Sequence, residues 1–102
     1  MTMVTQTVTF TPPAGTDGAT AVNAIRNLLP TPVIDFLNQS DDAGTRTSTL
    51  TESSGTFTMT TQWDASIISE YKGMMANVSQ GVKDSLAGQG WTISFSPETA
   101  DL

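Results

Sequence analysis

The 102-residue sequence contains neither cysteine nor histidine. Without cysteine, disulfide bonds, thiolate metal sites and cysteine nucleophiles are excluded. Without histidine, the chain lacks the commonest general base, the commonest zinc ligand and the usual pH-sensitive side chain. Ser-His-Asp, Cys-His and histidine–metal chemistry are therefore ruled out. We expect no metal, no cofactor and no catalytic residue in this chain.

Charged residues are also scarce, at 14% of the chain, against about 25% in an average protein. Four basic and ten acidic residues give a net charge of −6. Binding to a phosphate backbone needs several clustered basic residues, but Arg26, Arg46, Lys72 and Lys83 are far apart in the sequence. We therefore expect no nucleic-acid partner.

Long hydrophobic runs are missing as well. The apolar runs are far shorter than the roughly 20 residues that cross a bilayer. The first ten residues, MTMVTQTVTF, have neither the basic start nor the apolar centre of a signal peptide. We expect a soluble, cytoplasmic protein without a membrane partner. Residues 1–102 are long enough for one domain with one hydrophobic core.

What the sequence has in abundance is alternating threonine. The stretch Thr45–Trp63 reads as two Thr-rich runs joined by Ser-Ser-Gly. Alternation with a period of two is typical of β-strands, and Gly55 can adopt the positive φ of a short turn. The stretch therefore predicts a β-hairpin. Its first strand carries one large apolar residue, Leu50, so we expect this strand at an edge of the sheet.

Two further strands show the same one-sided pattern near the ends of the sequence. The first is Thr2–Thr11, which ends at the rigid Pro12-Pro13 pair. The second is Trp91–Ser96, which ends at Pro97. We expect the acidic residues 97–102 to form a frayed tail.

A helical segment follows the first strand. Thr16 or Asp17 is a suitable N-cap, and Pro30 must end or kink the helix. Residues 33–37 fit a short second helix better than a strand, although a strand is the alternative. Residues 38–44 contain many turn-forming residues and predict a polar loop.

A second helical segment follows the hairpin. Asp64 or Ser66 can cap it, and apolar residues at steps of three and four from Ile67 to Leu86 predict about five helical turns. Gly88 and Gly90 provide the stop.

The predicted order of elements is β-α-β-β-α-β. Each strand has one apolar or mixed face and one face of threonine and serine, which requires a single sheet covered on one side. We predict an α+β, ferredoxin-like two-layer sandwich, with a four-stranded antiparallel sheet in the order 4-1-3-2.

The uncovered face of this sheet is flat, β-branched and uncharged. It would hold Thr5, Thr7, Thr9, Thr47, Thr49, Thr56, Thr58, Thr60, Thr92 and Ser94. Three interpretations are open: a solvated face, a contact with a second copy or a protein partner, or a regular array that orders water as ice-binding surfaces do. For the contact we expect an interface that includes Thr7, Thr9, Thr49, Thr58, Thr60 and Thr92.

The same features resemble a known superfamily, the dimeric α+β barrels, and most of all its small antibiotic-biosynthesis-monooxygenase-like members. The resemblance is carried by Phe10-Thr11-Pro12 with Gly15 opening a helix, and by the run Phe57–Asp64, in which a strand ends in tryptophan and passes directly into a helix. It implies that two sheets pair through their open faces. Some members oxidise aromatic substrates without a cofactor, and members commonly carry a histidine early in the second helix, the neighbourhood in which this chain has Tyr71. In composition the chain is also similar to small phage proteins of low charge.

Trp63, Tyr71, Met74 and Trp91 are candidates for an aromatic site between helices and sheet that binds a flat apolar ligand; the alternative is that they are ordinary core residues. We thus have two hypotheses. The chain is a non-catalytic protein that self-associates or binds a protein partner through its open face, or it is a ligand-binding or cofactor-independent monooxygenase-like domain. A solid core favours the first, and a closed cavity that a polar group faces favours the second.

Overall fold

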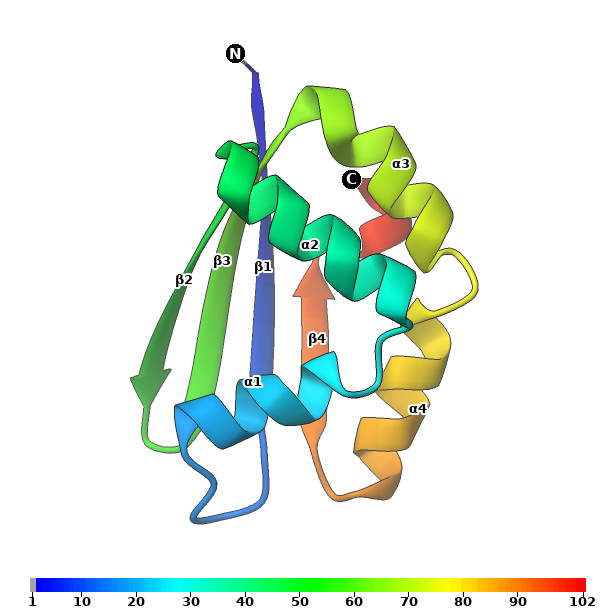
Figure 1. Cartoon of the computed structure of the whole chain (residues 1–102). Coiled ribbons are helices and arrows are strands. Elements are labelled where there is room, and N and C mark those ends of the chain that lie inside the picture. The colour runs from blue at the N-terminus through cyan, green and yellow to red at the C-terminus, as the bar shows by residue number, and fades with distance from the viewer. Residues whose placement is uncertain (1) are drawn as a thin grey trace.

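The computed structural model of the protein describes residues 2–102. Its four strands form one antiparallel sheet in the order β2-β3-β1-β4, and the helices lie on one face of it (Figure 1). This confirms the predicted ferredoxin-like α+β arrangement and strand order. In chain order the elements are β1 (Met3–Thr11), α1 (Gly18–Arg26), α2 (Thr31–Ala43), β2 (Arg46–Ser53), β3 (Thr56–Asp64), α3 (Ala65–Met75), α4 (Ser79–Gly88), β4 (Thr92–Ser96) and the 3-10 helix η1 (Thr99–Asp101).

The predicted hairpin is confirmed as β2 and β3. Ser53 pairs with Thr56, so the connection is the two residues Ser54 and Gly55, with φ of 51° and 84°. Two positive φ values match the right-handed twist of the flanking strands. The strand β2 lies at the sheet edge, as the single exposed Leu50 predicts.

The first helical segment is longer than its sequence predicts. The carboxylate of Asp17 caps α1 by accepting a hydrogen bond from the Thr20 amide at 2.8 Å, which lowers the pKa of Asp17. Residues 33–37 are helical, but α2 continues through residues 38–43, where we had predicted a loop. That prediction was wrong because Phe36 and Ser40 lie on one buried helix face, and α2 ends only at Gly44, with φ of 75°.

The second helical segment is broken, which corrects the expectation of one continuous helix. The elements α3 and α4 are separated by residues 76–78, and the Ser79 hydroxyl donates to the Met75 carbonyl at 3.1 Å across the break. An unbroken helix over residues 65–88 would be about 36 Å long, longer than the roughly 30 Å of a nine-residue strand. The break keeps both halves of the apolar stripe on the sheet.

The hydrophobic core consists of two clusters. The first cluster, between α2, α3 and the end of β3, is Val33, Phe36, Leu37, Trp63, Ile68, Tyr71 and Met75. The second cluster, between α1, α4 and the other end of the central strands, is Phe10, Ala21, Phe57, Val82, Leu86 and Trp91. Leu29 and Val78 contact both clusters. Leu29 lies between α1 and α2, and Val78 lies between α3 and α4. The two clusters therefore meet at the level of these two helix interruptions.

Residues 97–102, for which we expected a frayed tail, are packed against the domain. The Gln6 amide nitrogen donates to the Pro97 carbonyl and to the Thr99 hydroxyl, both at 3.1 Å. Leu102 packs against the first cluster, and the Lys72 ammonium donates to its carbonyl at 3.1 Å. The segment thereby closes the side of the domain next to α3.

Candidate functional site

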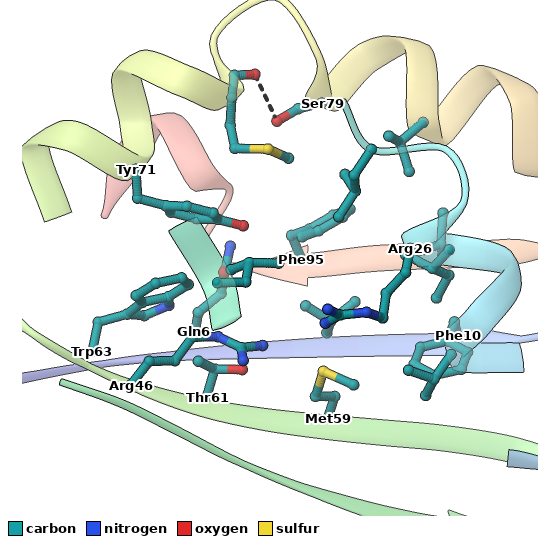
Figure 2. A pocket seen from close by; sticks show the side chains of 18 residues that line it. Gln6, Phe10, Arg26, Arg46, Met59, Thr61, Trp63, Tyr71, Ser79 and Phe95 are labelled. Carbon is teal, nitrogen blue, oxygen red and sulfur yellow. Dashed lines mark hydrogen bonds between the residues drawn. The ribbon is translucent and has the colours of Figure 1, made fainter. Parts of the chain in front are cut away.

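A cavity of about 100 Å³ lies between the sheet and the helices, where the two core clusters meet (Figure 2). All four strands and all four α-helices contribute to its lining. Most of the lining side chains are apolar: Val8, Phe10, Val22, Ile25, Leu29, Leu37, Met59, Trp63, Met75, Val82, Ile93 and Phe95. The cavity is therefore mainly a hydrophobic space inside the fold.

Two polar residues form part of the cavity floor in the middle of the sheet. Gln6 on β1 and Thr61 on β3 are direct cross-strand partners, and they are only 3% and 4% exposed. They interrupt the apolar alternation on the helix-covered face of the two central strands. The contacts to Pro97 and Thr99 fix the amide of Gln6.

Arg46 reaches the cavity from the first residue of β2. Its Nη1 atom donates to both carboxylate oxygens of Asp41 on α2, at 2.8 and 3.0 Å, and its Cζ atom lies 5.3 Å from the ring centroid of Trp63. The ion pair and the aromatic ring explain how a guanidinium group can be 9% exposed. The Nε atom of Arg46 is buried and has no hydrogen-bond acceptor in residues 2–102.

Tyr71 supplies a neutral hydroxyl beside these groups. Its ring stacks on Trp63 with centroids 4.2 Å apart, and Figure 2 shows its hydroxyl directed into the cavity. Burial raises the pKa of Tyr71, opposed by the charge of Arg46 and a hydrogen bond with Thr99. The lining contains no Asp, Glu, His, Cys or Lys, hence no side chain that normally titrates between pH 5 and 8. The arrangement suits binding better than proton transfer.

The structure brings together only part of the site expected from the sequence. Trp63 and Tyr71 both line the cavity. Met74 packs against the first cluster but does not line the cavity. Trp91 belongs to the second cluster, beside Phe10 at a centroid distance of 6.1 Å.

Sequence reasoning missed the polar lining residues. Gln6 and Thr61 were detectable as polar residues at alternating positions that are otherwise apolar. The sequence shows Arg46 only as one of four basic residues that are far apart along the chain. Nothing in the sequence indicates that Arg26, on the last turn of α1, lines the cavity.

The open face of the sheet is a second candidate surface. Strand register completes two rows of its residues across β2, β3, β1 and β4, and the contact of 2.9 Å between the Thr11 and Thr56 hydroxyls joins a third. The rows are Thr49-Thr60-Thr7-Ser96, Thr51-Thr58-Thr9-Ser94 and Ser53-Thr56-Thr11-Thr92. All six residues expected at an interface belong to these rows, and none of the twelve positions is charged or aromatic.

Within residues 2–102, no cluster of three or more acidic, histidine or cysteine side chains could hold a metal ion. No helix of that part of the chain has the length and apolar character needed to cross a bilayer.

No protein-family model matches the chain, and comparisons with curated proteins and with solved structures give no match. The likeness to dimeric α+β barrels therefore rests on topology, with which the observed element order and sheet are compatible.

Proposed function

We propose that the protein binds a small, mainly apolar molecule in the cavity between its sheet and its helices. One observation carries the proposal. Within residues 2–102, the buried side-chain nitrogens without a hydrogen-bond partner are Nε of Arg46 and Nε1 of Trp63, and both residues line this cavity. The two unused donors thus belong to residues that line the same cavity.

The buried donors support an occupant. An unsatisfied buried donor costs about 1–3 kcal/mol. A ligand with an apolar body and one acceptor group would cover the apolar lining and offset that cost. A cavity of about 150 Å³ accommodates benzene in another protein, so this smaller cavity suits the apolar part of a molecule with few carbon atoms.

Filling the cavity should abolish binding. We expect pentan-1-ol, benzene or pentanoate to shift the NMR signals of the Trp63 indole N–H and the Met59 methyl in a saturable manner. The Trp91 indole N–H, outside the cavity, should not respond. Val8→Phe places a larger side chain in the cavity and should remove the response. The control Val4→Phe changes a half-buried valine on the same face of β1 that does not line the cavity, and it should leave binding intact.

Two results would contradict the proposal. One is that no member of this probe panel shifts the Trp63 or Met59 signals saturably. The other is that folded Val8→Phe binds the probes as well as the unmodified protein does.

A second candidate function, self-association through the open face, is favoured by the threonine rows. A second copy of this chain is the occupant that the surface suits best, because a face without charge meets an identical face without charge repulsion. Strands about 4.8 Å apart and eight residues long give about 500 Å² in each copy, or about 1,000 Å² in total, near the lower limit of specific interfaces. The twist of roughly 20–25° between strands keeps the hydroxyls out of one plane, which disfavours an ordered water layer.

Charge placed on the open face should separate the two copies. Thr7 and Thr58 lie on the central strands β1 and β3, so replacing both by lysine sets like charges in the middle of the contact. We expect light scattering to show a dimer for the unmodified protein and a folded monomer for Thr7→Lys/Thr58→Lys. The control Thr20→Lys/Ser69→Lys adds the same charge on exposed helix positions and should remain dimeric. A monomeric unmodified protein at high concentration would leave the open face solvated and exclude the proposal.

A further inference from the structure

The cavity has an unusual charge for this chain. The protein carries four basic and ten acidic residues. Two of the four basic residues, Arg26 and Arg46, line the cavity, and no acidic residue does. A positive, mainly apolar cavity inside an acidic protein is suited to a negatively charged ligand.

The two arginines approach the cavity from different elements. Figure 2 shows the guanidinium ends of Arg26, from α1, and Arg46, from β2, pointing toward one another. The Nη2 atom of Arg26 donates to the side-chain oxygen of Asn38 at 2.9 Å, and within residues 2–102 no carboxylate lies at salt-bridge distance from Arg26. Asp41 compensates the charge of Arg46, so Arg26 leaves one uncompensated positive charge at the cavity, which an anion would offset.

Arg46 is also positioned to use its free donor. Asp41 holds the Nη1 atom, and the Trp63 ring lies against the guanidinium group. These contacts fix the group while Nε is left buried and without an acceptor. A carboxylate matches the planar fork of a guanidinium group, and it is less strongly charged than a phosphate.

We propose that the cavity binds a small apolar monocarboxylate. Its carboxylate oxygens accept hydrogen bonds from Nε of Arg46 and from the guanidinium group of Arg26. Its hydrocarbon body lies against Val8, Met59 and Phe95. This assignment rests on the proposed ligand-binding function and adds the chemical class of the ligand.

The test compares pentanoate with pentan-1-ol, a probe of the same chain length without charge. The readout is the Trp63 indole N–H signal. At pH 7 we expect pentanoate to bind roughly tenfold more tightly than pentan-1-ol, since a charge-assisted hydrogen bond contributes about that factor. Arg26→Gln should lower the affinity for pentanoate roughly tenfold and leave that for pentan-1-ol unchanged. Lys72→Gln removes one positive charge from a residue outside this cavity and should change neither affinity.

The pH dependence provides a second measurement that does not rely on a variant. No lining side chain normally titrates between pH 5 and 8, so the affinity for pentanoate should be constant from about pH 6 to 8, where pentanoate is ionised. It should fall at lower pH, as pentanoate itself becomes protonated, while the affinity for pentan-1-ol stays unchanged.

Each outcome has one interpretation. Equal affinities for pentanoate and pentan-1-ol, or pentanoate binding unaffected by Arg26→Gln, would overturn the carboxylate assignment and leave the ligand-binding function standing. If neither these probes nor benzene bind, the proposed function fails together with the assignment. Selective pentanoate binding that Arg26→Gln weakens supports both.

Discussion

Replacement of Trp63 by alanine should lower the free energy of unfolding by about 3–5 kcal/mol, the range for buried aromatic truncations. Trp63 is 1% exposed, and its ring stacks on Tyr71 at 4.2 Å and on Phe36 at 6.3 Å. Its ring also contacts the guanidinium group of Arg46 in a cation–π interaction. The substitution therefore enlarges an existing cavity and removes the aromatic ring that supports a buried charge.

Chemical denaturation measures this loss directly, and Trp63→Phe is the matched control because it retains an aromatic ring. We expect the phenylalanine variant to lose clearly less stability than the alanine variant. A loss below about 1 kcal/mol for Trp63→Ala, typical of surface positions, would mean that Trp63 faces solvent and that β3 pairs in another register.

Replacement of Leu86 by alanine should also be costly, at about 2–5 kcal/mol. Leu86 is fully buried in the second cluster. Unlike Trp63 it does not line the cavity. Leu86→Ala should therefore reduce stability without changing probe affinity at a temperature at which the variant is folded, whereas Trp63→Ala should reduce both.

Comparing Leu86→Ala with Trp63→Ala separates effects on global stability from effects on binding in the cavity. Leu50→Ala is the control, because Leu50 is 39% exposed on the edge strand and should lose less than about 1 kcal/mol. Denaturation midpoints for the three variants, combined with titration of pentanoate followed at the Met59 methyl signal, complete the experiment. Unchanged stability of Leu86→Ala would contradict the assignment of Leu86 to the core.

The architecture could be predicted because its signals are local. Alternation from Phe57 to Trp63 marks a strand with one buried face, and Gly55 marks the turn before it. Four strands with the same asymmetry permit few arrangements other than one sheet covered on one side. Strand order follows from the single apolar residue of the edge strand, Leu50.

The cavity could not be predicted, since it depends on contacts between distant residues. The sequence does not explain a buried Gln6 on an otherwise apolar strand face. The explanation is its hydrogen bonds to Pro97 and Thr99, which are distant in the sequence. The burial of Arg46 depends on Asp41, which the sequence assigns to a loop and the structure places on α2. The helix break after Met75 contains no proline, so the sequence does not indicate it. Local patterns report propensity, and packing decides these positions.

The pairing of β1 with β4 affects how the chain can fold during synthesis. β1 is made first and is a central strand, but one of its two neighbours, β4, is made last. Gln6 and Thr99, which form a hydrogen bond beside this pair, are 93 positions apart. While the ribosome is still adding β4, one side of β1 has unpaired backbone groups that can pair with other nascent chains. We therefore expect the pairing of β1 with β4, which joins distant parts of the chain, to form later than the local hairpin.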